Sequence, residues 1–291
     1  MHKNILVTGM NGQLGSEFQA LSQEYTHYYF TFTDKNTLDL SNLCKLEEYF
    51  DDKDFDLIIN CAAYTAVDKA EEETELADSI NHKGASLLAK IAKNKAIALI
   101  HISTDYVFDG KNFRPYNESD TTSAQSVYGQ SKRDGEKAIL SVNAKNTLII
   151  RTSWVYSSFG NNFVKTMLRL AEQRDELGLI YDQVGTPTYA RDLARTILEI
   201  YPSIDNNTPE IYHYSNEGVA SWYDFAKTIF ELSGINCKVH PIETKDYPTA
   251  AARPHYSVLN KSKIKQNFNI EIPYWKDALI SCLKTLKENH V

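Results

Sequence analysis

The chain has 291 residues, of which 42% are hydrophobic, and its formal net charge at pH 7 is −7. This length can bury one large core or two closely joined ones. The acidic balance provides no basic field for nucleic acid or for an anionic membrane surface, so we expect neither as a partner. The N-terminus shows no charged leader and no long apolar segment, which predicts a cytoplasmic protein. Four cysteines and eight histidines lack the spacing of metal ligands, so we predict no metal site.

Short apolar runs alternate with helical stretches through the first half of the chain. The runs lie at residues 5–7, 29–32, 57–59, 97–100 and 148–150, and each predicts a buried strand. After the third run, apolar residues recur at the i, i+4, i+7 spacing of an amphipathic helix. This rhythm predicts an α/β fold, a Rossmann-type doubly wound parallel sheet covered by helices.

Beyond Arg151 the rhythm loosens, and loops rich in Gly, Pro, Asn and Ser appear at 157–162, 183–188 and 215–218. Helices are predicted at about 189–201, 222–232 and 275–287, and a strand at 211–214. We therefore expect residues 1–151 to form a dinucleotide-binding domain, which a helix and strand from about 189–214 rejoin. The remainder of 152–291 is predicted to form a smaller, interleaved C-terminal substrate-binding lobe.

A Gly-x-x-Gly-x-x-Gly pattern, formed by Gly9, Gly12 and Gly15, follows the first predicted strand and opens a helix. That context is what makes a glycine pattern indicate a dinucleotide site. The backbone N–H groups of Gly12, Gln13 and Leu14 would face the pyrophosphate at the helix N-terminus, where the helix dipole favours anions.

Other candidate cofactor contacts follow the second and third strands. Asp34 stands about twenty residues after the glycine loop, where a carboxylate can accept hydrogen bonds from the adenosine ribose, which favours NADH. Lys35 could instead neutralise a 2′-phosphate, so NADPH stays open. Asp39 and Leu40 are candidates for flanking the adenine, although Asp39 could equally belong to a helix-capping turn before Ser41. Ala62, Ala63, Tyr64 and Thr65 follow the third strand, where small residues would let the cofactor lie against backbone.

The pattern Tyr-x-x-x-Lys occurs three times, but only Tyr128 and Lys132 lie between the fourth and fifth predicted strands. We expect Tyr128 to protonate a substrate carbonyl oxygen as hydride arrives, Thr104 to orient that oxygen, and Lys132 to bind the nicotinamide ribose. A free phenol has a pKa of about 10, and we expect Lys132 and the oxidised nicotinamide to lower it toward neutrality. The other two pairs are predicted to be helix-surface pairs: Tyr49 with Lys53, and Tyr223 with Lys227.

Taken together, these residues resemble a known family, the dTDP-4-dehydrorhamnose reductases among the extended short-chain dehydrogenases. The resemblance covers most of the chain. Its most specific stretches are residues 60–71, 103–108, 151–156, 161–163, 182–188 and the pair Arg253 and Pro254.

The resemblance implies reduction of the C4 ketone of dTDP-4-dehydro-L-rhamnose to dTDP-L-rhamnose by NADPH or NADH, for cell-surface polysaccharide. It also implies that Tyr128 donates the proton, that Thr104 and Asp105 contact the sugar, and that Trp154 lies beside it. Asn162 and Arg253 are candidates for holding the diphosphate or sugar, since an acidic chain needs a local donor and a guanidinium can bind phosphate through two hydrogen bonds.

Some members of this family use magnesium at a dimer interface. The sequence here contains no carboxylate cluster that requires a metal, and it leaves a homodimer open.

Two other functions remain open at this point. A nucleotide-sugar epimerase or dehydratase shares the fold and the Tyr-Lys pair but regenerates its NAD, so stoichiometric NADH consumption separates it from a reductase. A non-catalytic regulatory subunit of methionine adenosyltransferase also keeps this fold. The complete set of Thr104, Tyr128 and Lys132 favours catalysis.

Overall fold

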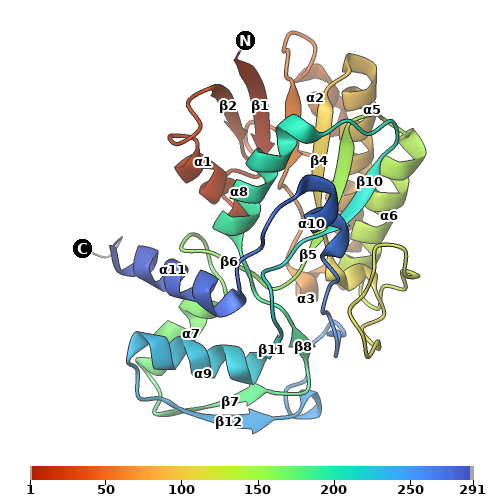
Figure 1. Ribbon diagram of the computed structural model, residues 1–291. Coiled ribbons are helices and arrows are strands. Elements are labelled where there is room, and N and C mark those ends of the chain that lie inside the picture. Colours follow the sequence, from red (N-terminus) through yellow and green to blue (C-terminus); the bar gives the residue numbers. More distant parts are fainter. Residues whose placement is uncertain (1, 289–291) are drawn as a thin grey trace.

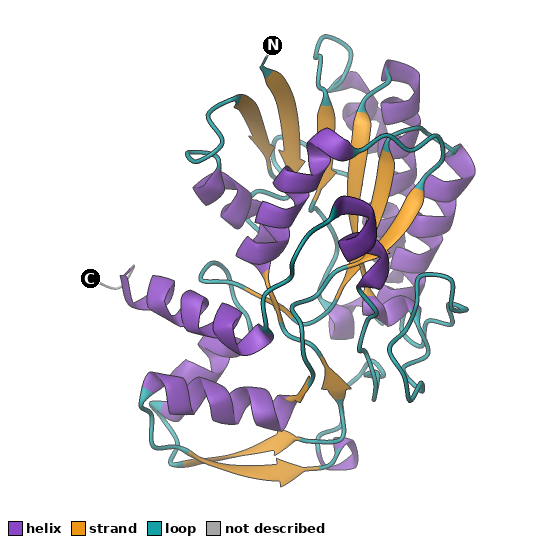
Figure 2. Cartoon of the chain, viewed as in Figure 1, coloured by secondary structure: helices purple, strands orange, loops and turns teal. Residues whose placement is uncertain are grey.

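The computed structural model describes residues 2–288, and its centre is a parallel sheet of six strands in the order β10-β5-β4-β3-β1-β2 (Figures 1 and 2). Every neighbouring pair in this sheet is parallel. The predicted strands and their order along the chain are therefore confirmed. Their bounds are β1 (Lys3–Thr8), β2 (Tyr28–Thr33), β3 (Leu57–Asn60), β4 (Ala98–Thr104), β5 (Thr147–Thr152) and β10 (Glu210–His213).

Helices cover both faces of the sheet because successive residues of each strand point to opposite faces. Ile5, Val7, Leu57 and Ile59 pack in one apolar cluster with α1 (Gln13–Leu21) and α8 (Ala190–Ile200). The alternate residues, among them Leu6, pack in a second cluster with three helices of the other face. These are α2 (Leu43–Glu48), α5 (Ala85–Lys95) and α6 (Val127–Val142). This doubly wound arrangement confirms the predicted fold class.

The helix predicted after the third strand is divided in the structure. It consists of α3 (Val67–Ala70), α4 (Thr74–Asp78), a π-helical turn (Ser79–Gly84) and α5. A π-helical turn adds a residue to the helical repeat and turns the side chains that follow it. Here the turn contains Asn81, whose buried side chain hydrogen-bonds both the 62–65 loop and α6.

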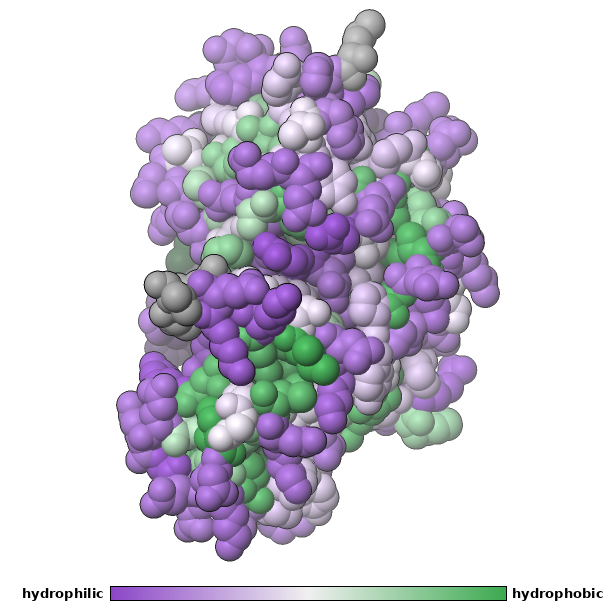
Figure 3. Space-filling view, turned by 60° about the vertical axis from the view of Figure 1, so that its left-hand side comes forward, coloured by the Kyte–Doolittle hydropathy of each residue, from purple (hydrophilic) through white to green (hydrophobic). Residues whose placement is uncertain are grey.

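The C-terminal lobe has an apolar cluster of its own, which contains Phe225, Ile229, Leu279 and Leu283. Figure 3 shows hydrophobic residues gathered over this lobe on one face of the molecule. Its larger elements are α7 (Phe163–Ala171), β7 (Glu176–Ile180), α9 (Trp222–Ser233), β12 (Lys238–Ile242) and α11 (Trp275–Glu288). Short strands join it to the rest of the chain: β6 (Val155–Tyr156) pairs with β9 (Thr188–Tyr189), and β8 (Val184–Gly185) pairs with β11 (Ala220–Ser221).

Three segments from the second half of the chain pack on the sheet, and one of them is α10 (Ser262–Phe268), which contacts β10 and adds Ile264 to the cluster of α1 and α8. Helix α8 packs against α1, and β10 pairs with β5 at the sheet edge. The described residues also contain three short 3-10 turns, which are η2 (Asp105–Val107), η3 (Tyr201–Ser203) and η4 (Thr244–Asp246). The division into domains at residue 151 stays a prediction. Among residues 2–288, no helix is both long enough and apolar enough to cross a bilayer.

Candidate active site

A cavity of about 710 Å³ lies at the carboxyl ends of the central strands and reaches from the glycine loop to Trp154. This edge of a doubly wound sheet is where such folds bind their ligands. Most of the residues predicted to contact cofactor or substrate line it: Gly9, Gly12, Gln13, Leu14, Gly15, Asp34, Asp39, Leu40, Ala62, Ala63, Thr65, Thr104, Asp105, Tyr128, Lys132 and Trp154.

The glycine loop brings backbone to the floor of the cavity. Gly9 has a φ of +70°, and a Cβ at this position would lie 2.8 Å from the backbone nitrogen of Ala62. Only glycine fits such a left-handed, close-packed position without strain. Gly12 is the N-cap of α1 and provides no side-chain cap, so the first N–H groups of the helix stay free for an anion.

Asp34 presents a fixed carboxylate at the end of β2. Its oxygens accept hydrogen bonds from the backbone N–H groups of Asn36 and Thr37 and from the side chain of Asn11. The Thr37 bond is the main reason why the pKa of Asp34 lies below its usual value. Lys35 lines the same part of the cavity. The carboxylate that favours NADH and the ammonium that favours NADPH therefore lie together.

Asp39 forms a local turn and also lines the cavity. Its Oδ1 accepts hydrogen bonds from the backbone N–H of Ser41 at 2.9 Å and from the Ser41 hydroxyl at 2.7 Å, which is the local turn considered as an alternative. Asp39 also lines the cavity beside Leu40.

Tyr64 lies outside the cavity lining, although it was predicted with Ala62, Ala63 and Thr65. Its hydroxyl donates to Glu73 at 2.6 Å, and its backbone N–H donates to Asn81 at 2.8 Å. The side chain is therefore drawn away toward the helices after β3, and we leave Tyr64 out of the proposed cofactor contacts.

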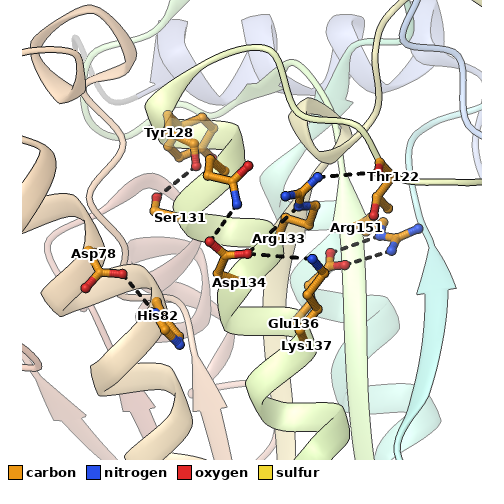
Figure 4. A network of polar contacts seen from close by, with 11 residues as sticks. Asp78, His82, Thr122, Tyr128, Ser131, Arg133, Asp134, Glu136, Lys137 and Arg151 are labelled. Atoms are coloured by element: carbon orange, nitrogen blue, oxygen red, sulfur yellow. Dashed lines mark hydrogen bonds and ion pairs between the residues drawn. The ribbon is translucent and has the colours of Figure 1, made fainter.

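Helix α6 carries the predicted proton donor in its first turn. Ser126 caps the helix by accepting a hydrogen bond from the Gly129 N–H at 3.2 Å. Tyr128, Lys132 and Glu136 then follow at intervals of four residues and share one face. The ring of Tyr106 meets the ring of Tyr128 edge to face, with centroids 5.5 Å apart, and Figure 4 shows Tyr128 at the start of the helix.

The pKa of Tyr128 differs from the expectation. Burial raises it to about 12, and the hydrogen bond with Thr104 opposes this only in part. Lys132 does not lower this pKa in the protein alone, since other groups hold its ammonium, and the effect of the oxidised nicotinamide stays a prediction. A phenol with a raised pKa keeps its proton at neutral pH, as a proton donor must.

Lys132 is 1% exposed and points into the sheet. Its Nζ donates to the carbonyl oxygen of Ile102 at 2.7 Å and lies 3.2 Å from His101 Nε2. Burial lowers the pKa of Lys132 to about 8, while the carboxylate of Glu136 favours the charged form. Lys132 therefore remains mainly an ammonium at neutral pH.

Glu136 and Arg151 form a buried ion pair that fixes α6 to β5, as Figure 4 shows. Arg151 donates to both oxygens of Glu136, with Nε at 2.9 Å and Nη2 at 2.7 Å, and both side chains are at most 3% exposed. The hydroxyl of Ser103 also donates to Glu136. Sequence reasoning missed this pair, although Glu136 follows Lys132 by one helical turn.

Thr104 and Asp105 form a polar pair at the end of β4. The Thr104 hydroxyl donates to Asp105 Oδ1 at 2.9 Å. Within residues 2–288, no group makes a hydrogen bond of normal geometry to the buried Asp105 Oδ2, although the Ser257 hydroxyl acts on the same carboxyl group and lowers its pKa in part. Burial raises the pKa of Asp105 to about 7. A buried acceptor without a donor is suited to a ligand hydroxyl, because a buried polar atom left without a hydrogen bond is costly.

The remaining predicted substrate contacts lie in different places. Trp154 lines the cavity and has a left-handed φ of +49°. Asn162 does not line it: its amide caps α7 through the Lys165 N–H and donates to the carbonyl oxygens of Ser157 and Phe159. Because these bonds occupy its amide, we leave Asn162 out of the proposed substrate contacts. The neighbouring Asn161 lines the cavity instead.

Arg253 lines a second cavity of about 220 Å³, and Tyr106 lines both cavities. Arg253 Nη2 lies 2.6 Å from Asp68 Oδ2, so an ion pair already orients the guanidinium. Arg253 Nη1 is buried and donates to no group among residues 2–288. A free donor beside the main cavity is compatible with binding an anionic ligand.

The other two Tyr-x-x-x-Lys pairs line neither cavity. Each is a local pair in which the ammonium lies over the ring, at 4.5 Å from the Tyr49 ring centroid for Lys53 and at 5.6 Å from the Tyr223 ring centroid for Lys227. In the described part of the chain, no three His, Cys, Asp or Glu side chains come together to hold a metal ion.

The family model, the relatives and the solved structures that resemble this chain agree on one family. Residues 3–288 match the family model described as the RmlD substrate binding domain. The chain is 42% identical over 285 residues to the dTDP-4-dehydrorhamnose reductase of Aggregatibacter actinomycetemcomitans, with 94% of this chain and 96% of that protein covered.

Two crystal structures are also similar. The dTDP-4-dehydrorhamnose reductase of Clostridium acetobutylicum matches with a TM-score of 0.93 and 40% identity, covering 98% of this chain and 99% of that one. The dTDP-4-dehydrorhamnose reductase of Bacillus anthracis, solved in complex with NADP, matches with a TM-score of 0.92 and 37% identity, covering 98% of this chain and 100% of that one.

Proposed function

This chain belongs to the family of dTDP-4-dehydrorhamnose reductases, and we propose that it reduces the C4 ketone of dTDP-4-dehydro-L-rhamnose to dTDP-L-rhamnose. The product enters cell-surface polysaccharide. The observation that carries the proposal is the placement of Thr104, Tyr128 and Lys132 at one end of a cavity whose other end is the glycine loop.

The residues along the cavity fit a reduced nicotinamide cofactor. Gly9 and Gly12 provide the close backbone and the free helix N-terminus that a pyrophosphate needs. Asp34 provides the acceptor for ribose hydroxyls and Lys35 a cation near the same position. When bound, this cofactor supplies the hydride.

The chain's own residues then bind the ketone and supply the proton. Thr104 donates a hydrogen bond to the carbonyl oxygen, and Tyr128 gives the same oxygen its proton, since burial keeps the phenol protonated. Lys132 holds the cofactor ribose through its ammonium. Asp105 Oδ2 accepts from a sugar hydroxyl, and Trp154 covers the sugar ring. Arg253 binds the diphosphate.

Cofactor choice is part of the proposal. Asp34 favours NADH, and Lys35 favours the 2′-phosphate of NADPH; NADP is present in the structure of the Bacillus anthracis relative. Both cofactors are therefore to be compared at the same substrate concentration. Lys35→Ala is expected to weaken NADPH binding and to leave NADH binding unchanged.

The test is oxidation of NADPH and NADH in the presence of dTDP-4-dehydro-L-rhamnose, with the product identified by NMR. A reductase consumes one cofactor molecule for each dTDP-L-rhamnose formed. An epimerase converts the sugar without net cofactor consumption, and a non-catalytic subunit gives no conversion. Either of these two results from folded protein would reject the proposed function.

A further inference from the structure

Three polar side chains lie in register across the strands beneath the active site. Thr8 on β1 is paired with Asn60 on β3, and Asn60 is paired with His101 on β4. Each is 1% exposed. On the same face, two residues earlier in each strand, Leu6, Ile58 and Leu99 belong to the apolar cluster beneath α5 and α6. A buried polar row directly after an apolar layer must satisfy its hydrogen bonds internally.

The row is a continuous chain of contacts that ends at Lys132. Thr8 Oγ1 lies 2.7 Å from Asn60 Oδ1, and Asn60 Nδ2 lies 2.9 Å from His101 Nδ1. His101 Nε2 lies 3.2 Å from Lys132 Nζ. Thr8 Oγ1 also accepts the backbone N–H of Ala62, which is part of the cavity lining. His101 itself does not line the cavity.

The number of protons available along this row of side chains restricts the tautomer of His101. The ammonium of Lys132 can only donate, so His101 Nε2 must accept. A neutral imidazole carries one proton, which is then on Nδ1 and must be donated to an oxygen. A half turn of the Asn60 amide exchanges its oxygen and nitrogen and places the oxygen there. The Asn60 nitrogen then donates to Thr8 Oγ1, which also accepts the Ala62 N–H, so that Asn60, His101 and Lys132 are all paired.

The other assignment requires a different charge on Lys132. If His101 Nε2 carried the proton, it would have to donate to a neutral Lys132 amine, with Asn60 Nδ2 donating to Nδ1. The tautomer of His101 and the charge of Lys132 are therefore linked through a single hydrogen bond.

We propose that His101 is a positioning residue for Lys132: as the neutral Nδ1–H tautomer, paired with the Asn60 amide oxygen, it accepts a hydrogen bond from the Lys132 ammonium at Nε2. This inference deepens the proposed function, because Lys132 holds the cofactor ribose as an ammonium. His101 acts through Lys132 and contacts neither substrate nor cofactor.

The charges around Lys132 agree with this role. Lys132 is faced by Glu136 on its own helix, by Cys61 after β3 and by His101 on β4. Burial lowers the pKa of Lys132 to about 8, so its charge changes within the range in which enzymes work. The pKa of His101 lies well below 6.5, because of burial and then because of Lys132, so the imidazole is neutral. Removing its acceptor is expected to lower the pKa of Lys132 further.

The direct test is the tautomer, measured by ¹⁵N NMR of the purified full-length protein labelled at histidine, without cofactor or substrate. The His101 signals are those lost in His101→Gln. His213 is an internal reference, because its Nδ1 lies 3.1 Å from the Tyr116 carbonyl oxygen and must carry the proton. We expect His101 at pH 6.5 to show a protonated Nδ1 and an unprotonated Nε2, as His213 does. A protonated Nε2 would overturn the proposal, whether or not the protein proves to be a reductase.

A second test measures the dissociation constant of NADPH against pH in His101→Leu and His101→Gln. A fall of the Lys132 pKa by about one unit reduces its charged fraction about 5-fold at pH 8 but by only about a tenth at pH 6. His101→Leu is therefore expected to weaken NADPH binding about 5-fold at pH 8 and less than about 2-fold at pH 6. Gln provides a carbonyl acceptor in place of Nε2, so His101→Gln is expected to restore most of the affinity at pH 8.

His213→Gln is the matched control, since it removes another buried imidazole from the same sheet. It is expected to keep the wild-type pH dependence of NADPH binding. Wild-type pH dependence in folded His101→Leu, or equal weakening at both pH values, would contradict the positioning role. If His101→Leu does not fold, His101→Gln and the NMR measurement decide. A loss of NADPH affinity in His101→Gln of about 5-fold at pH 8, which is the loss expected for His101→Leu, would contradict the acceptor role.

Discussion

The indole of Trp154 lies flat against the indole of Trp222, with ring centroids 3.6 Å apart and the ring planes 7° from parallel. Trp154 follows β5 and lines the main cavity, whereas Trp222 begins α9 in the C-terminal lobe. The Trp222 Nε1 donates to Gln183 at 3.1 Å, which fixes its orientation. The stack therefore holds a residue of the proposed sugar site in its left-handed backbone conformation through a helix of the C-terminal lobe.

Trp222→Ala is expected to raise the KM for the nucleotide sugar about 2- to 12-fold, because loss of an aromatic pair costs about 0.5–1.5 kcal/mol beyond its area. The dissociation constant of NADPH is expected to stay unchanged. Steady-state kinetics and calorimetry measure the two quantities. Trp222→Phe keeps an aromatic face and should stay near wild type, and an equal loss of cofactor and sugar affinity in Trp222→Ala would contradict this role.

Tyr128→Phe removes the proposed proton donor and little else. We expect kcat to fall about 10²- to 10⁴-fold, which is the usual contribution of a positioned proton donor. NADPH affinity should stay within about 2-fold of wild type, as measured by fluorescence titration. Tyr223→Phe is the matched control, since Tyr223 also precedes a lysine by four residues but lines neither cavity. Near wild-type turnover in Tyr128→Phe would show that Tyr128 is not the proton donor.

Asp105 is expected to make stability depend on pH in the opposite direction to most carboxyl groups. Its pKa is about 7 in the folded protein because of burial, against 3.8 ordinarily. Between these values the folded state binds more protons than the unfolded state, so stability falls as the pH rises from about 4 to 7. Asp105→Asn removes this titration and should be more stable than wild type above pH 7, by on the order of 2–4 kcal/mol. The gain should vanish near pH 4.

Urea unfolding at pH 4, 5.5, 7 and 8 measures this difference. Asp109→Asn is the control with the opposite sign, because the hydrogen bond from Tyr116 holds the pKa of Asp109 below its usual value. Its stabilising contribution is present above the unfolded pKa and is lost as the pH falls, so Asp109→Asn should be less stable than wild type at neutral pH. A difference for Asp105→Asn that does not change with pH would show that the carboxyl group does not titrate as described.

Arg253→Ala is expected to weaken binding of dTDP by about 10-fold or more, because a hydrogen bond to a charged group contributes about 1.5–3 kcal/mol. NADPH binding should be unaffected. Calorimetric titration with each ligand measures both. Arg114→Ala is the matched control, since Arg114 is exposed, lies 3.7 Å from Asp120 and lines neither cavity. Equal weakening of dTDP and NADPH binding would argue against a diphosphate contact.

The sequence predicts the sheet well because its strands are buried on both faces and therefore appear as continuous apolar runs, such as Leu57 to Ile59. The glycine loop and the Tyr-Lys pair are also recognisable in the sequence, because each depends on the spacing of a few neighbouring residues. The row of Thr8, Asn60 and His101 could not be predicted, because it depends on which strands pair and in what register.

Two features of the site differ from what the sequence suggests, for physical reasons of the same kind. Asn162 has the composition of a ligand contact, but an Asn before a helix is equally suited to capping, and only the fold shows which bonds occupy its amide. The raised pKa of Tyr128 follows from the depth of its burial, which sequence spacing does not report.

The most direct test of the proposed reduction follows the hydride from the cofactor to the sugar. NADPH carrying deuterium at both C4 positions of the nicotinamide is oxidised in the presence of dTDP-4-dehydro-L-rhamnose, and the product is analysed by NMR. We expect one deuterium at C4 of dTDP-L-rhamnose for each cofactor molecule consumed. Product without deuterium at C4, or conversion of the sugar without net oxidation of NADPH, would contradict the proposed reduction.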